Sequence, residues 1–289
     1  MSMDANLVRR VAFALVAIPL ALLLVWYGGV PLALLLALTA ILGTRELFDL
    51  AARGNVRPLR ILGIVSAGLL PLIVFTSMTS PDVGSWVAEW WPYGAALWVI
   101  LLLSATLALR SPAERPLSAV AVSVLAVVYT GALPAFLLAI RHANHPLRSW
   151  AGAWLVFYPL VVTWVCDTAA MFGGRAFGGP KLAPSVSPGK TRSGSIAGVV
   201  GGVAVAPLFA ALVPRSDLEL RLGQLLVIAG VLSVVGQIGD LAESLFKREA
   251  GVKDSSALIP GHGGVLDRFD SLYFVIPTAA ALYHAFGAI

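Results

Sequence analysis

The chain has 289 residues, of which 58% are hydrophobic and 12% are charged, and its mean hydropathy is +0.88. Soluble domains carry roughly 25% charged residues, so this composition excludes a disordered chain and argues strongly against a water-soluble one. A single cysteine, Cys166, excludes an internal disulfide framework and a cysteine-rich zinc site, and the meaning of the net charge of +5 depends on where the Lys and Arg residues lie.

A helix needs about 20 mostly apolar residues to cross a bilayer. Nine stretches meet this need: 11–27, 30–50, 59–78, 93–109, 117–140, 150–172, 195–213, 222–246 and 269–287. The first follows two arginines, but no small-residue cleavage site comes after it, so we expect a retained span and not a signal peptide. The sequence therefore predicts an all-α polytopic helical bundle that forms one integral membrane domain, 1–289. Residues 1–150 supply N-terminal spans, and residues 151–289 supply spans and polar loops.

The distribution of basic residues predicts the orientation of these spans. With nine spans, 16 of the 20 Lys and Arg residues fall at the N-terminus and in alternate loops. The opposite loops hold only four, namely Arg141, Arg148, Arg215 and Arg221. Cytoplasmic loops are enriched in Lys and Arg, so the split predicts a cytoplasmic N-terminus and an external C-terminus. The positive charge is then explained by topology, and we expect no nucleic-acid partner.

Four carboxylates lie at positions where lipid would make a charge costly. Asp167 is in the sixth span, Asp240 is in the eighth, and Asp267 and Asp270 lie one helical turn apart at the start of the ninth. Each is expected at a similar depth on the cytoplasmic side, and intramembrane acids usually face a protein interior or a wet cavity. Four converging carboxylates beneath a basic surface suggest a site for a divalent cation such as Mg²⁺, which also uses substrate phosphates as ligands.

The eighth span carries a polar stripe on an otherwise apolar helix. Ser233, Gln237, Asp240, Ser244 and Lys247 recur at spacings of three and four, and Glu243 can pair with Lys247. One interpretation is a buried helix whose polar groups are satisfied by its neighbours. The other is a functional site, which the basic, glycine-rich loop after this helix favours.

Two loops have the composition of a phosphate-binding surface. The loop after the eighth span contains Lys247, Arg248, Lys253 and Arg268, with glycines that let backbone N–H groups approach an anion. His262 lies among these glycines, either as an ordinary turn residue or beside a substrate. The other loop, 173–192, is rich in glycine, proline and basic residues, and its prolines favour a rigid shape over a purely topogenic role.

The second loop is not a P-loop, although it ends in Gly189-Lys190-Thr191. Pro184 occupies the position of the required earlier glycine, and no strand precedes the loop. In the seventh span, Gly198 and Gly202 have the spacing of a GxxxG motif, for which close helix packing is the main interpretation.

The C-terminal half resembles the phosphatidate cytidylyltransferases, or CDP-diacylglycerol synthases. The resemblance rests on Ser244-Leu-Phe-Lys-Arg, then Lys253-Asp254, then His262-Gly-Gly-Val-Leu-Asp267-Arg-Phe-Asp270. The segments 181–191 and 167–168 also match that family, whereas residues 1–150 are similar only as a series of apolar spans. The resemblance implies transfer of a cytidylyl group from CTP to phosphatidic acid, which gives CDP-diacylglycerol and pyrophosphate.

The resemblance also implies a site and a cellular setting. It implies Mg²⁺ as cofactor, K⁺ as a second cation, a homodimer, and phosphatidic acid drawn from the inner leaflet of a bacterial inner membrane, with the site facing the cytoplasm. The implied catalytic residues are Asp240, Asp267, Lys247, Arg248 and His262, and the implied metal ligands are Asp240, Asp267, Asp270 and Asp167. The implied substrate-binding residues are Ser187, Lys190, Thr191, Arg192, Ser244, Lys253, Asp254, Gly263, Gly264 and Arg268.

Other functions are less consistent with the sequence. A CTP-dependent lipid-alcohol kinase would also be polytopic and metal-dependent, but it would transfer the γ-phosphate and release CDP. A transporter could use Asp167 and Asp240 to carry protons or cations, but the repeats and paired broken helices typical of transporters are absent from the sequence. A CDP-alcohol phosphotransferase would need an Asp-rich motif on one span, which the sequence lacks.

Overall fold

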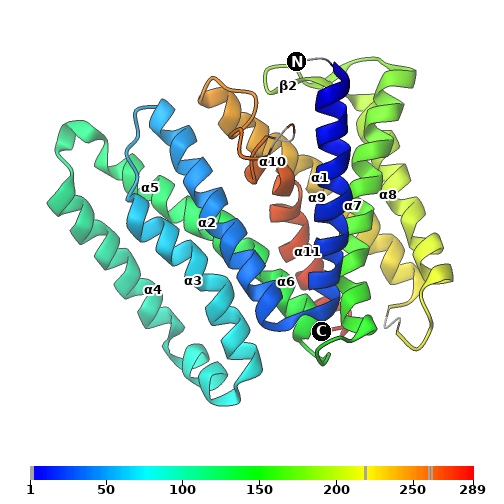
Figure 1. Cartoon of the computed structure of the whole chain (residues 1–289), viewed down its shortest axis with the longest axis horizontal. Coiled ribbons are helices and arrows are strands. Elements are labelled where there is room, and N and C mark those ends of the chain that lie inside the picture. Colours follow the sequence, from blue (N-terminus) through cyan, green and yellow to red (C-terminus); the bar gives the residue numbers. More distant parts are fainter. Residues whose placement is uncertain (1–2, 218–219, 260, 262) are drawn as a thin grey trace.

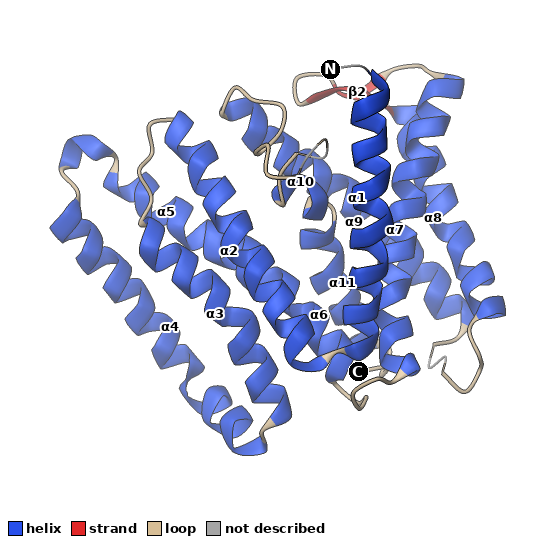
Figure 2. Cartoon of the chain, in the orientation of Figure 1, coloured by secondary structure: helices blue, strands red, loops and turns tan. Residues whose placement is uncertain are grey.

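The computed structural model describes residues 3–217, 220–259, 261 and 263–289. Its helices are α1 (Met3–Tyr27), α2 (Gly29–Arg53), α3 (Arg60–Thr79), α4 (Pro81–Leu109), α5 (Pro116–Ala126), α6 (Leu133–His142), α7 (Trp150–Phe177), α8 (Arg192–Leu212), α9 (Leu222–Glu249), α10 (Leu266–Phe269) and α11 (Leu272–Ala285). A 3₁₀ turn, η1 (Pro112–Glu114), precedes α5, and a π-helical segment, η2 (Val127–Ala132), joins α5 to α6. The expected all-α polytopic membrane fold is confirmed (Figure 2).

Seven helices of the described ranges are long and apolar enough to cross a membrane. They are α2, α3, α4, the continuous helix Pro116–His142, α7, α8 and α9. The expected first and ninth spans correspond to α1, which has 25 residues, and to α11, which has 14. Because α11 is shorter than the about 17–25 residues of a typical span, the count of nine stays a prediction.

The fourth helix starts well before residue 93, where the fourth expected span begins. The chain turns only at Ser80, and α4 starts directly at Pro81 and continues through Pro92 to Leu109. Proline is well accommodated in the first turn of a helix, where its missing N–H is not needed. The tryptophans of this segment therefore lie on a helix, with Trp86 and Trp91 more than half exposed.

The helices form two groups with α6 and α11 between them (Figure 1). Helices α2, α3, α4 and α5 pack together on one side, and α7, α8 and α9 pack together on the other, with α1 against α7. A hydrogen bond within the second group joins α7 to α9, since the Tyr158 hydroxyl donates to the Leu225 carbonyl at 2.6 Å. Another joins this group to α11, since the Tyr283 hydroxyl donates to the Leu155 carbonyl at 2.8 Å. Large apolar side chains on the outer faces, such as Ile61, are exposed as lipid contact requires.

One short hairpin departs from the helical pattern. Strand β1 (Lys181–Ala183) pairs antiparallel with β2 (Ser187–Thr191) between α7 and α8. This segment was expected to be a loop. Its strands are only three and five residues long and contain Pro and Gly, so they show no clear alternation of apolar residues. The hairpin lies at the end of the molecule where α1 starts (Figure 1).

The glycines of α8 allow close packing on α7, as the GxxxG spacing predicts. A Cβ at Gly198 would lie 3.0 Å from the Cys166 carbonyl oxygen and from the Ala170 methyl group. Cys166 itself is buried at this contact. The α7–α8 contact therefore depends on the absence of a side chain at Gly198.

Replacing Gly198 by Leu is expected to destabilise the protein by about 1–3 kcal/mol, because overpacking forces the two helices apart. Thermal unfolding in detergent measures the effect. The control is Gly223→Leu at the start of α9, where nothing lies within 4 Å of the added Cβ. Equal unfolding temperatures for the two variants would contradict close packing at Gly198.

Candidate active site

Asp240 lies on α9 where the end of the hairpin reaches it. Its Oδ2 forms an ion pair with Lys190 Nζ of β2 at 2.5 Å, and its Oδ1 accepts a hydrogen bond from the Ser244 hydroxyl at 3.4 Å. Both charged side chains of the pair are 27–28% exposed. Both side chains are thus partly exposed, while the Lys190 Nζ atom itself is buried against Asp240.

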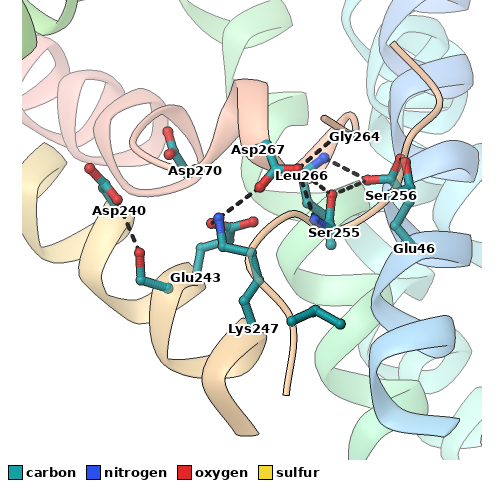
Figure 3. A network of polar contacts seen from close by, with 12 residues as sticks. Glu46, Asp240, Glu243, Lys247, Ser255, Ser256, Gly264, Leu266, Asp267 and Asp270 are labelled. Carbon is teal, nitrogen blue, oxygen red and sulfur yellow. Dashed lines mark hydrogen bonds and ion pairs between the residues drawn. The ribbon is translucent and has the colours of Figure 1, made fainter. Parts of the chain in front are cut away.

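The polar stripe on α9 divides into two parts with different roles. Gln237 donates to the carbonyl oxygens of Ser195, at 3.3 Å, and Ser233, at 3.1 Å, so this part joins α9 to α8. Asp240, Ser244 and Lys247 face other polar groups near the basic loop (Figure 3). The packing interpretation therefore fits Gln237, and the functional interpretation stays a prediction for Asp240, Ser244 and Lys247.

Asp267, on the short helix α10, accepts hydrogen bonds from several directions (Figure 3). Its Oδ1 contacts Lys247 Nζ at 2.7 Å, and its Oδ2 accepts from the Ser255 N–H at 2.8 Å, the Ser255 hydroxyl at 2.9 Å and the Gly264 N–H at 2.8 Å. Burial raises the pKa of this carboxyl, but the hydrogen bonds from Gly264, Lys247 and Ser255 outweigh burial and hold the pKa below its usual value. Asp267 is therefore ionised at neutral pH and fixes the loop before it.

Lys247 bridges two carboxylates in the protein interior. Its Nζ lies 2.5 Å from Glu243 Oε2, one turn earlier on α9, and 2.7 Å from Asp267 Oδ1. Glu243 is completely buried. The predicted pairing of Glu243 with Lys247 is confirmed. An ammonium group has three N–H donors, so two are engaged and a third is left for a ligand.

The predicted residues of the hairpin and of the end of α9 are partly structural. The Thr191 hydroxyl accepts from the Gly194 N–H at 3.1 Å and thereby caps α8. Arg248 donates to the carbonyls of Val186, at 3.1 Å, and Val252, at 2.8 Å, and so ties the hairpin to the loop after α9. The remaining predicted hairpin residues are Ser187, which is half-buried on β2, and Arg192, which is exposed at the start of α8.

A polar cavity of about 370 Å³ lies in the loop between α9 and α10. Lys253, Asp254, Gly263 and Arg268 line it, so four residues predicted to bind substrate do come together. The predicted His262 lies outside the described residues. Gly263 and Gly264 have no room for a side chain, because a Cβ would overlap Asp267 at the first and Glu46 at the second.

Asp270 and Asp167 stand apart from the bonded network around Asp267. Asp270 Oδ1 accepts from the N–H of Ser271 at 2.6 Å, and a Cβ at Gly239 would lie 2.8 Å from the Asp270 carbonyl oxygen, so Asp270 packs beside α9 next to Asp240. Asp167 is exposed on α7. In the described ranges no three His, Cys, Asp or Glu side chains are grouped closely enough to hold a metal ion by themselves.

Glu46 also belongs to this network, although no sequence motif predicted it. Glu46, near the end of α2, is 4% exposed and accepts hydrogen bonds from Ser255, Ser256, Val265 and Leu266. Its position in the last turns of an apolar span was the available signal, since a buried charge in such a span usually has a function. The first half of the chain therefore contributes to a site whose recognisable motifs all lie in the second half.

Comparisons with known proteins agree with the arrangement. The model of the cytidylyltransferase family matches residues 8–286. Phosphatidate cytidylyltransferases from Staphylococcus saprophyticus and Bacillus subtilis are 34% and 33% identical to the chain, over 93% of its length and 95% and 94% of theirs. The enzyme of that name from Brucella suis is 51% identical over 146 residues, which are 48% of each chain.

Proposed function

The chain belongs to the cytidylyltransferase family, and we infer that it transfers the cytidylyl group of CTP to phosphatidic acid, with CDP-diacylglycerol and pyrophosphate as products. The observation that carries this inference is similarity to phosphatidate cytidylyltransferases over almost the whole chain. The cluster of acidic and basic groups beside a polar cavity suits the reaction, because both substrates are phosphates.

The reaction needs positioning and charge neutralisation more than a covalent intermediate. A phosphate oxygen of phosphatidic acid attacks the α-phosphorus of CTP, the bond from that phosphorus to the bridging oxygen breaks, and pyrophosphate leaves. Lys190, Lys253 and Arg268 neutralise the triphosphate and the lipid phosphate. We assign the third N–H of Lys247, beside its contacts with Glu243 and Asp267, to the same phosphates. His262 remains a proposed neighbour of the nucleotide.

The carboxylates fit a Mg²⁺ site that is completed by substrate. Asp240 has only Lys190 and Ser244 as described partners, and Asp267 Oδ1 keeps one lone pair beside its contact with Lys247. Mg²⁺ commonly takes one or two carboxylates, water and substrate phosphates as ligands. Asp240 and Asp267 would hold it, with Asp270 and Asp167 as further ligands or outer partners, and it would supply positive charge to the phosphates.

The remaining features of the proposal concern the membrane and assembly. The hairpin lies at the end of the molecule where α1 starts, and the C-terminus lies at the opposite end, which supports a site on the side of the N-terminus (Figure 1). The excess of basic residues on that side supports a cytoplasmic location in a bacterial inner membrane. K⁺ as a second cation and a homodimer complete the proposal.

The test of the reaction uses purified protein in detergent with phosphatidic acid, Mg²⁺ and CTP labelled at the α- or γ-phosphate. Label from the α-position is expected in the lipid, with release of pyrophosphate. Label from the γ-position in the lipid would instead identify a kinase. Absence of both, with folded protein and with K⁺ and native lipids added, would favour transport over cytidylyl transfer.

A further inference from the structure

Glu46 is a charged side chain buried at the junction of two distant parts of the chain. Its helix, α2, lies in the first half of the sequence, and its hydrogen-bond partners are 209 to 220 residues away. Only 4% of the residue is exposed. A carboxylate buried in this way is stable only when hydrogen bonds replace the water it has lost. The partners of Glu46 therefore indicate its role.

All four described donors to Glu46 come from the loop around the polar cavity. Oε1 accepts from the Ser256 hydroxyl at 2.7 Å and from the Val265 N–H at 3.0 Å, and Oε2 accepts from the Ser255 hydroxyl and the Leu266 N–H, both at 2.9 Å. Each oxygen thus uses two acceptor positions. Glu46 has little capacity left for substrate and acts through the loop.

The hydrogen bonds hold both ends of the cavity loop. Ser255 and Ser256 lie on one side of the segment 257–264, which supplies part of the cavity lining, and Val265 and Leu266 lie on its other side. Ser256 both donates to Glu46 and lines the cavity, beside Lys253 and Arg268. The carboxylate therefore joins the two ends of the loop and fixes the distance between them. We call this set of hydrogen bonds from Ser255, Ser256, Val265 and Leu266 to Glu46 the clasp.

The same clasp bears on Asp267. The Ser255 hydroxyl lies 2.9 Å from Asp267 Oδ2 and 2.9 Å from Glu46 Oε2, so its single proton is shared between the two carboxylates and connects them. Gly264 lies between them, and a Cβ there would overlap the Ser255 hydroxyl and the Glu46 carboxylate. A change at Glu46 is thus transmitted to Asp267 through one residue, without any contact between Glu46 and the reacting atoms.

We propose that Glu46 is a positioning residue, which holds the loop of Lys253, Ser256, Gly263 and Arg268 in the form that binds the triphosphate of CTP. This inference rests on the proposed function for the identity of the nucleotide. It assigns to the N-terminal half an indirect part in nucleotide binding, through the loop that Glu46 holds. Lys253 and Arg268 are the groups that contact the phosphates, and Glu46 determines where they stand.

The test replaces Glu46 by Gln, which keeps the shape but removes the charge and turns an N–H₂ group toward donors. We expect CTP affinity to fall roughly 10- to 100-fold, with a corresponding rise in the KM for CTP. This factor corresponds to the about 1.5–3 kcal/mol that hydrogen bonds to a charged group contribute. The KM for phosphatidic acid and the thermal midpoint in detergent are expected to stay close to wild type. A fold that is loosened as a whole would change all four quantities together.

The matched control is Asp49→Asn, one turn further along α2. Asp49 is half exposed and pairs with Arg60 at 2.7 Å, away from the cavity loop, so the same change of charge should leave CTP binding unaltered. Ser256→Ala is the second variant. Because Ser256 acts through Glu46, its effect on CTP binding should be clear in the wild type and small in the Glu46→Gln background.

The outcomes separate this inference from the proposed function. If the wild-type protein transfers no cytidylyl group, the proposed function is wrong. Equilibrium binding of CTP to the wild type and to Glu46→Gln would still test the role of Glu46. Unchanged CTP affinity in Glu46→Gln, or parallel loss of CTP affinity, lipid affinity and stability, would overturn the inference. If Glu46→Gln does not fold, Ser256→Ala decides: a raised KM for CTP supports the clasp, and a wild-type value overturns it.

Discussion

Replacing Asp240 by Asn is expected to lower kcat/KM for cytidylyl transfer by at least about 100- to 1,000-fold, a loss typical of removing a group that stabilises transition-state charge. The side chain keeps its shape but loses the charge that faces Lys190 and the proposed Mg²⁺. The protein should still fold, because Asp240 is only half-buried and Lys190 can remain hydrated. Transfer of α-label from CTP to lipid measures the loss, and the thermal midpoint in detergent checks the fold.

The control for this prediction is Glu249→Gln, since Glu249 is an exposed carboxylate in the last turn of the same helix. It should keep wild-type activity. Activity of Asp240→Asn within a few-fold of wild type would remove Asp240 from the metal site and leave the ion pair with Lys190 as a structural contact. A large loss together with a large drop in stability would have the same consequence.

The ion pair between Asp240 and Lys190 also indicates how the site changes when substrate enters. Lys190 is held by a carboxylate at 2.5 Å in this structure, and both groups remain about a quarter exposed. A triphosphate brings more negative charge than one carboxylate, so it can take Lys190 as a partner and leave Asp240 to bind Mg²⁺. The pair therefore keeps the two groups close and oriented before substrate arrives.

Apolar runs predicted the architecture well but predicted helix ends less well. The spans of α2, α3, α7, α8 and α9 agree with expectation within a few residues. The fourth span was expected to start at 93 because Pro81, Glu89 and Pro92 interrupt the apolar pattern. Pro81 lies in the first turn of α4, where proline is tolerated, and at Pro92 the helix continues without the hydrogen bond that its missing N–H would donate to Ala88.

The site was predicted where its members are close in sequence and was missed where they are distant. The spacing from Ser244 to Asp270 contains Lys247 and Asp267, which the structure joins at 2.7 Å. Glu46 has no such spacing, because its contacts span more than 200 residues and depend on how α2 packs beside α10. Only its charge within an apolar span could have marked it.

Lys247→Met is expected to lower the free energy of unfolding by about 3–5 kcal/mol, which is the usual cost of leaving a buried carboxylate without its partner. Glu243 is completely buried, and Lys247 is its ion-pair partner at 2.5 Å. The cost at Asp267 is smaller, because the N–H groups of Ser255 and Gly264 still donate hydrogen bonds to its carboxylate. The fall in thermal midpoint in detergent measures the effect, and Lys247→Arg, which keeps the charge, should be milder.

A second substitution separates the structural role of Lys247 from its proposed role in binding phosphate. Glu243→Gln in the Lys247→Met background removes the unpaired charge, so the double variant should recover much of the stability. If the refolded double variant stays inactive, Lys247 contacts substrate through its third N–H. If it regains activity, Lys247 serves only to hold Glu243 and Asp267 in place, and the phosphates are bound by Lys190, Lys253 and Arg268. Failure to recover stability would show that the lost packing of Lys247, and not the bare charge of Glu243, destabilises the single variant.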